Sequence, residues 1–214
     1  MTSDTDTPPR ILFEDPTAVR IYVELQEIEP VIWRRLLVPL HFNLAQLHHI
    51  IQAAFGWQDA HLHQFNIGGL RFGDAEFMEA ERIDDDEPRT FEAAGVMLKD
   101  FSFNRDGGAT FEYLYDFGDN WKHTIRLEEE LVVKPMPKTA TCLEGARSGP
   151  PEDVGGAHGY ARFLRILLNP KEDELREQKE LKVWSGGKFN PSAFDLTRTE
   201  KAVRGALRRH RNLG

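Results

Sequence analysis

The chain has 214 residues, of which 40% are apolar and 10% aromatic. A chain of this kind can bury about 70% of its unfolded surface, which is typical of a globular protein with one large or two small domains. Its formal charge of -8 disfavours a general nucleic-acid coat protein, because the whole molecule repels phosphate. A single cysteine, Cys142, excludes an internal disulfide and fits a reducing compartment. No apolar stretch approaches the roughly 20 residues of a membrane helix and no signal peptide is evident, so we expect a cytoplasmic protein with no membrane partner.

Alternating apolar and polar residues indicate that strands dominate the first two thirds of the chain. Residues 1–16 have little to bury and are expected to form a mobile tail, whereas residues 17–214 are expected to form a single domain. The alternation that starts at Val19 predicts an antiparallel hairpin over residues 18–38.

One helix is expected to follow this hairpin. Asn43 can cap its N-terminus, Gln46 lies three residues later as in a capping box, and Gly56 is placed to end it. Residues 61–72 then return to extended character, with a glycine pair that allows a two-residue turn between two further strands.

Two loops and another hairpin are expected in the middle of the chain. Residues 74–92 carry many acidic and few apolar side chains, which predicts an exposed acidic loop. Residues 96–98 indicate a short helix or turn, and residues 111–129 are the strongest hairpin candidate. Residues 142–156 contain so many glycines and prolines that we expect no regular element there.

Helices dominate the last third. Apolar residues at helical spacing predict a helix over residues 160–168, followed by a charged helical stretch up to Lys179, and Asn190-Pro191 is expected to begin a short helix. A basic terminal helix is expected over residues 198–214. This order predicts an α+β fold with a mainly antiparallel sheet, one helix after the first hairpin and a helical C-terminal third.

The hairpin over residues 111–129 carries the residues best suited to chemistry. A two-residue or four-residue turn around Asp119 places Asp116 opposite His123. Asp116 can then orient His123 as a general base, act beside it as a metal ligand, or form a cross-strand hydrogen bond that only fixes the turn.

A divalent metal is the cofactor that these residue types can hold. His61 and His63 are two positions apart, so on a strand both project from one face and can supply nitrogen ligands. The alternative is that they only line an exposed strand face. His48 and His49 are adjacent on the expected helix and point about 100° apart, so we interpret them as a core-flanking and a surface residue rather than joint ligands. The candidate metal ligands are His61, His63, Asp116, Asp119 and His123.

The loop over residues 142–156 supplies a second group of polar residues. Glu152 and Asp153 present two carboxylates that can also serve only for helix capping or solvation, and Gly155-Gly156 allows backbone amides to bind an anion where the next helix begins. The candidate catalytic residues are Asp116, His123, Glu152 and Asp153. The candidate ligand-binding residues are His61, His63, Tyr115, Asp116, Asp119, Trp121, His123, Glu152 and Asp153.

Five sequence strings follow one another in an order found in a known family. They are PVIWRRLLVP, HLHQF, YLYDFGDNWKHTIRLE, CLEGARSGPPEDVGG and KFNPSAFD. From about Val19 to Phe194 the chain resembles the plasmid pRiA4b ORF-3-like family, also described as passenger proteins of an insertion element. The resemblance implies a compact α+β domain that is often carried on bacterial chromosomes and mobile elements, and it implies no established activity.

Three functions remain open. The first is a binding module whose pocket, formed by the YDFGDNWKH hairpin, the HLH strand and the PPEDVGG loop, holds a small polar ligand, a metal or a peptide. The second is a metal-dependent hydrolase in which Glu152 or Asp153 acts as base on a bound water. The third is a nucleic-acid accessory role through the basic residues of 198–211, which the net charge opposes. We favour the first, because no catalytic spacing such as HExxH is present.

Overall fold

The computed structural model of the chain describes residues 14–80, 88–101 and 109–210. The strands are β1 (Ala18–Leu25), β2 (Trp33–Pro39), β3 (His63–Ile67), β4 (Leu70–Gly73), β5 (Thr90–Glu92), β6 (Thr110–Tyr115), β7 (Trp121–Leu131) and β8 (Thr141–Ala146). The helices are α1 (Leu44–Phe55), α2 (Ala75–Ala80), α3 (Gly156–Leu168), α4 (Leu175–Trp184) and α5 (Leu196–His210). Short 3-10 turns occur at η1 (Ala93–Gly95), η2 (Leu98–Asp100) and η3 (Glu172–Glu174).

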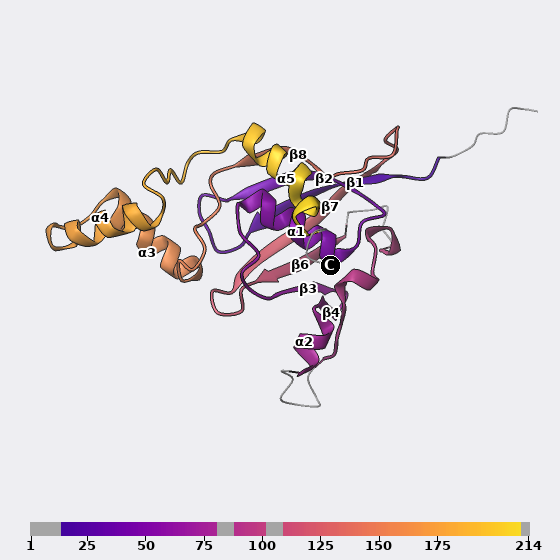
Figure 1. The fold of residues 1–214 in the computed structure, drawn as a ribbon, viewed down its shortest axis with the longest axis horizontal. Helices are drawn as coiled ribbons and strands as arrows, with labels where there is room; N and C mark the ends of the chain where they lie inside the picture. The colour runs from indigo at the N-terminus through magenta and orange to yellow at the C-terminus, as the bar shows by residue number, and fades with distance from the viewer. Residues whose placement is uncertain (1–13, 81–87, 102–108, 211–214) are drawn as a thin grey trace, which may run out of the picture.

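The strands form an eight-stranded sheet in the order β5-β4-β3-β6-β7-β1-β2-β8 (Figure 1). The neighbouring pairs are antiparallel, apart from β4 and β5, which run parallel. Helices follow the strands in the C-terminal third. The predicted α+β class with a mainly antiparallel sheet is therefore confirmed.

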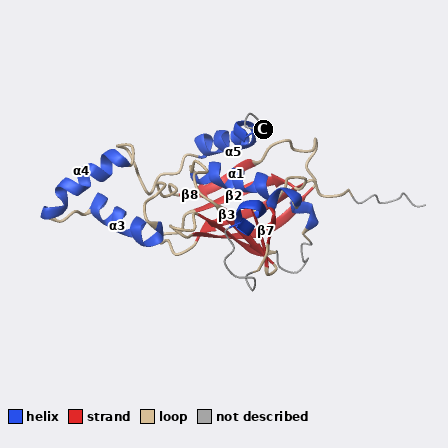
Figure 2. Ribbon diagram, turned by 60° about the horizontal axis from the view of Figure 1, so that its bottom comes forward, coloured by secondary structure: helices blue, strands red, loops and turns tan. Residues whose placement is uncertain are grey.

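One face of the sheet is covered and the other carries charged side chains. Helix α1 packs over the covered face and α5 lies on α1 and β8, while α3 and α4 extend to one side of the sheet (Figure 2). On the uncovered face, the Glu128 carboxylate pairs with both Arg20 and Arg35 at 3.0 and 2.9 Å. This arrangement explains the alternation along the strands, since each second residue faces solvent.

The first helix has the ends that its sequence predicts. The Asn43 side chain accepts a hydrogen bond from the backbone amide of Gln46, and the Gln46 side chain accepts one from the Asn43 amide. Gly56 ends the helix in a left-handed conformation with a φ of 86°. The predicted strand pairs β1–β2 and β3–β4 are also confirmed.

The predicted structure of three segments is wrong. The acidic stretch of residues 74–92 contains helix α2 and strand β5, although residues 81–87 lie outside the described part. The glycine-rich stretch that begins at residue 142 contributes β8, an edge strand that pairs with β2 despite its Gly145. The segment after Asn190-Pro191 forms a turn, and the next helix begins only at Leu196.

In the described residues, no helix combines the length and the apolar character that crossing a membrane requires.

Candidate functional site

The hairpin of β6 and β7 has a different register from the predicted one. Tyr113 pairs with His123 and Tyr115 with Trp121, so residues 116–120 form the connecting loop. Asp116 therefore does not lie opposite His123, and the predicted pairing of these two side chains is wrong.

The loop geometry explains this register. Asp116 has a left-handed φ of 56°, and its Oδ1 accepts hydrogen bonds from the amides of Gly118 and Asp119 at 2.9 and 3.2 Å. Such side-chain-to-backbone bonds stabilise a turn that strand alternation does not reveal. The Asp116 amide donates to the carbonyl of Leu62 at 2.9 Å, which joins the loop to the segment before β3.

His123 lies in the core and not in a site that solvent reaches. Its ring is fully buried among the rings of Phe55, Trp57 and Tyr113. Burial lowers the pKa of His123 to about 3, so its imidazole is neutral at physiological pH. Trp121 is also buried in the core, where its ring lies 5.9 Å from that of Trp57. Neither residue joins the polar group described next.

Polar side chains from three separate segments meet beside the hairpin loop. His61 Nε2 lies 2.8 Å from Asp153 Oδ1, 3.5 Å from Asp116 Oδ2 and 3.9 Å from Glu152 Oε2. The ligand atoms of His61, Asp116 and Asp153 lie within 4.8 Å of one another. We call His61, Asp116, Glu152 and Asp153 the carboxylate cluster. Imidazole and carboxylate ligands of this kind suit a divalent metal ion.

Hydrogen bonds hold the Glu152 carboxylate in place. The Gln58 amide donates to Glu152 Oε1 at 2.7 Å, and the Tyr115 hydroxyl donates to the two carboxylate oxygens at 3.2 and 3.3 Å. Burial raises the pKa of Tyr115 well above its usual value, so the hydroxyl keeps its proton. The Glu152 side chain is 15% exposed and that of Asp153 is 68% exposed, so the cluster opens to solvent at Asp153.

Asp119 ties the hairpin loop to the segment that carries Glu152 and Asp153. Its Oδ2 accepts a hydrogen bond from the Gly155 amide at 3.0 Å, directly before α3 begins. A carboxylate of the chain itself thus occupies a place where we expected a bound anion. Gly156 has a φ of +66°, and a Cβ there would lie 2.2 Å from the Asp119 carbonyl oxygen, so only glycine fits.

Arg34, for which the sequence predicted no role, holds the chain just before the segment that carries Glu152 and Asp153. The side chain points into the core and is 2% exposed. Its guanidinium donates hydrogen bonds of 2.7–2.9 Å to the backbone carbonyls of Trp33, Ala54, Ala146 and Arg147. It therefore links the end of α1 to the end of β8, where the chain enters the PPEDVGG segment. An arginine at an inward position of the string VIWRRLLV was the signal for this role.

His63 lies in a second group of polar side chains. Its ring stacks on that of His48 with a centroid distance of 3.5 Å and an interplanar angle of 8°. Asp59 lies 2.5 Å from His48 Nε2 and 3.2 Å from His49 Nδ1. We call His48, His49, Asp59 and His63 the histidine cluster. His48 is buried and His49 is partly exposed, which fits the separate positions predicted for them, and Asp59, in the loop after α1, contacts both.

Burial and charge set the protonation of the histidine cluster. Burial, with a smaller effect of the neighbouring His48, lowers the pKa of His63 to about 3. Burial alone would raise the pKa of Asp59, but hydrogen bonds from His48 and His49 outweigh it and hold that pKa well below its usual value. The cluster therefore contains an ionised carboxylate and an uncharged His63 at neutral pH.

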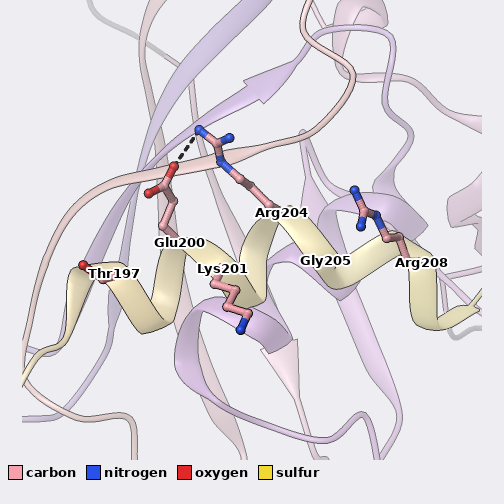
Figure 3. A pocket seen from close by; sticks show the side chains of 6 residues that line it. All are labelled: Thr197, Glu200, Lys201, Arg204, Gly205 and Arg208. Carbon is pink, nitrogen blue, oxygen red and sulfur yellow. Dashed lines mark ion pairs between the residues drawn. The ribbon is translucent and has the colours of Figure 1, made fainter.

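The basic helix α5 has one buried and one exposed side. Val203 and Ala206 pack in the core. The exposed side forms a groove lined by Thr197, Glu200, Lys201, Arg204, Gly205 and Arg208 (Figure 3). Glu200 pairs with Arg204 at 2.7 Å, so an acidic side chain interrupts the basic row.

Comparison with known proteins identifies the family. Residues 17–198 match the model of the Plasmid pRiA4b ORF-3-like protein family. The chain belongs to this family. It is 36% identical over 195 residues to the uncharacterized protein y4hQ of Sinorhizobium fredii (strain NBRC 101917 / NGR234), an alignment that covers 87% of this chain and 91% of that protein. The plasmid pRiA4b ORF-3-like resemblance of the sequence strings is thereby confirmed.

A solved relative shares the fold. The crystal structure of the protein of unknown function MM3350 from Methanosarcina mazei Go1 matches with a TM-score of 0.70 and 32% sequence identity, over 85% of this chain and 95% of that chain. Neither relative's name states an activity.

Proposed function

We propose that this protein is a ligand-binding module whose carboxylate cluster holds a divalent metal ion of the Mg²⁺ and Mn²⁺ class. The observation that carries the proposal is the convergence of His61, Asp116 and Asp153, whose ligand atoms lie within 4.8 Å of one another. Glu152 adds a third carboxylate 3.9 Å from the His61 Nε2. Oxygen-rich ligand sets of this kind suit hard divalent cations, which also neutralise the carboxylate charges.

The cluster is held ready for an ion. Two backbone amides fix the Asp116 carboxylate through Oδ1, which leaves Oδ2 directed toward His61. The Gln58 amide and the Tyr115 hydroxyl fix the Glu152 carboxylate. Ligands that are positioned before binding lose little conformational freedom when the ion arrives, which favours affinity. The exposed Asp153 provides the side on which an ion enters.

A bound ion explains how the module takes a further ligand. A divalent cation in this cluster keeps coordination positions open to solvent, and an oxygen of a small polar ligand or a peptide can occupy one of them. The hydrolase alternative requires in addition a carboxylate that is free to act as base on a metal-bound water. Glu152 Oε1 already accepts hydrogen bonds from Gln58 and Tyr115, and Asp153 is itself a proposed ligand of the ion, so we propose binding rather than hydrolysis.

Calorimetric titration tests the metal site. Protein without an affinity tag is stripped with EDTA and titrated with MnCl₂. We expect one Mn²⁺ to bind to the wild type and the affinity to fall at least about tenfold in His61→Ala and Asp116→Asn. Asn at position 116 tolerates the left-handed backbone, so this variant removes charge without straining the turn.

The matched control is His158→Ala, which removes an exposed histidine on α3 and should bind Mn²⁺ as the wild type does. A wild type that binds neither Mn²⁺ nor Mg²⁺ at millimolar concentration would rule out the proposed metal site and with it the hydrolase alternative. Equal affinity of wild type and Asp116→Asn would show that the ion binds elsewhere.

We also propose a cytoplasmic location. Cys142 is free and buried, and burial raises the pKa of its thiol to about 11, so the side chain is an unreactive thiol that suits a reducing compartment. Fractionation of the source cells should place the protein with cytoplasmic markers, and recovery from a membrane fraction would contradict the proposal.

A further inference from the structure

The histidine cluster contains possible metal-ligand atoms that do not belong to the carboxylate cluster. The two clusters are neighbours, since the Tyr115 ring lies 6.4 Å from that of His48 and 5.9 Å from that of His61. We propose that His48, His49 and Asp59 form a second metal site, which takes a transition-metal ion such as Zn²⁺ that prefers imidazole ligands. This inference stands on its own residues and does not depend on the proposed Mn²⁺ site.

The ligand atoms have the spacing that a small metal ion needs. Those of His48, His49 and Asp59 all lie within 4.8 Å of one another. His49 Nδ1 and Asp59 Oδ2 are 3.2 Å apart, and His48 Nε2 and Asp59 Oδ1 are 2.5 Å apart. Zn–N and Zn–O bonds of about 2.0–2.2 Å at tetrahedral angles require roughly 3.4 Å between ligand atoms, so the shorter contact has to open by less than about 1 Å.

The residue types fit the proposed ion. Two imidazoles and one carboxylate are the protein ligands of many catalytic zinc and non-haem iron sites, in which the remaining positions are open to water or substrate. The carboxylate-rich cluster around His61 prefers a harder ion. The two sites are therefore expected to select different metals.

A second layer of hydrogen bonds holds these ligands from behind. The Tyr113 hydroxyl lies 2.8 Å from His48 Nδ1 and accepts a hydrogen bond from Gln52 Nε2 at 3.1 Å. Gln52 Oε1 accepts from the Asp59 amide at 3.0 Å, which closes a ring of contacts through His48 and Asp59. An acceptor on Nδ1 is what a metal-binding histidine needs, because Nδ1 carries the proton when Nε2 binds the ion.

The site has an entry side and an additional nitrogen. The side chains of His49 and Asp59 are 21% and 26% exposed, whereas that of His48 is 2% exposed, so an ion reaches the cluster past His49 and Asp59. His63 stacks directly on His48, and its buried Nε2 has no hydrogen-bond partner among the described residues. Such an atom can accept a hydrogen bond from a water molecule on the metal.

Titration with Co²⁺, a spectroscopic substitute for Zn²⁺, tests the site. The protein is tag-free and EDTA-treated, and the titration is done in the wild type and in His61→Ala, which disables the carboxylate cluster. We expect visible absorption bands of bound Co²⁺ in both proteins, and we expect Zn²⁺ to displace the Co²⁺. Asp59→Asn and His49→Gln should each weaken Co²⁺ binding at least about tenfold, whereas His158→Ala should not.

The variants are chosen so that each remains foldable. Asp59 has a left-handed φ of 59°, a conformation that Asn tolerates, and His49 is partly exposed on α1. Melting curves of both variants show that the fold is kept, and if one variant fails to fold the other decides. A wild type without Co²⁺ bands and without Zn²⁺ binding overturns the inference and leaves a hydrogen-bonded His-Asp-His group. Co²⁺ bands that persist in both variants also overturn it.

The outcomes also separate the two proposals. If the wild type shows Co²⁺ absorption bands but does not bind Mn²⁺, only the proposed carboxylate site is ruled out. If the wild type binds Mn²⁺ but shows no Co²⁺ bands and no Zn²⁺ binding, only the proposed histidine site is ruled out.

Discussion

His61 lies beside the β6–β7 hairpin and His123 lies within it, on β7, and their surroundings differ completely. His61 is 31% exposed and faces three carboxylates. His123 is fully buried among aromatic rings and is held neutral, because burial lowers its pKa to about 3. Residue type therefore does not decide which histidine is available to a ligand. The surrounding charge and the access of solvent decide it.

The same contrast holds for the other charged groups. In the core, the Arg34 guanidinium is matched by four backbone carbonyls. In the carboxylate cluster, which opens to solvent at Asp153, three carboxylates share the single imidazole of His61. Core groups that are satisfied within the protein stabilise the fold, whereas the surplus negative charge of the carboxylate cluster is the charge that the proposed metal ion would neutralise.

The largest effect is expected in the core, from Arg34→Leu. This change leaves one buried and three partly buried carbonyls without their donor and should lower the free energy of unfolding by about 3–5 kcal/mol. Urea denaturation measures it. The control is Arg20→Leu, which removes a partly exposed ion pair with Glu128 and should cost less than about 1 kcal/mol. Similar losses in the two variants would contradict the assigned contrast between core and surface.

The pH dependence of stability should separate buried from exposed histidines. Because the pKa of His123 is about 3 in the folded protein and about 6.5 when unfolded, the unfolded state takes up the proton first as the pH falls. The contribution of the neutral His123 to the free energy of unfolding is complete above pH 6.5 and is lost toward pH 3. About 2 kcal/mol of it is lost between pH 6.5 and 5.

We expect His123→Gln to flatten the stability curve in this range when each protein is compared with its own value at pH 7.5. His63 has a similarly lowered pKa and should account for part of the remaining slope. His158→Gln, on the exposed side of α3, is the matched control and should leave the slope unchanged. Thermal unfolding at a series of pH values provides the measurement, and an unaltered slope in His123→Gln would refute the burial argument.

The smallest effect concerns the connection between the core and the carboxylate cluster. Asp119→Ala removes the hydrogen bond to the Gly155 amide and should cost about 1 kcal/mol, the usual value for a capping side chain. It should also weaken Mn²⁺ binding severalfold, because the segment with Glu152 and Asp153 loses its attachment. Asp195→Ala removes the comparable cap of α5, where Asp195 Oδ1 accepts from the Arg198 amide at 2.9 Å. It should lower stability equally without changing Mn²⁺ affinity.

Local rules were sufficient for much of the fold. The ends of α1 follow from Asn43, Gln46 and Gly56, since capping depends on residues within a few positions of each other. The first two strand pairs follow from alternation and short turns. Strand β8 could not be predicted, because pairing with β2 outweighs the low strand preference of its Gly145.

The site could be predicted only in part. The three strings that supply His61, Asp116 and Asp153 were recognised, and the structure brings these side chains together. The register that separates Asp116 from His123 depends on hydrogen bonds within one loop, which no periodicity shows. The role of Asp59 depends on the path of the chain after α1, which places it against two helical histidines.

The loop of residues 116–120 has two structural roles. Asp116 serves the carboxylate cluster and Asp119 anchors the start of α3 through the Gly155 amide. Most hairpin tips tolerate insertions, because only their ends are fixed. Here one added or deleted residue would move both aspartates out of place together. We therefore expect that this tip cannot be lengthened or exchanged for a generic turn, because the spacing of the two aspartates matters as much as their side chains.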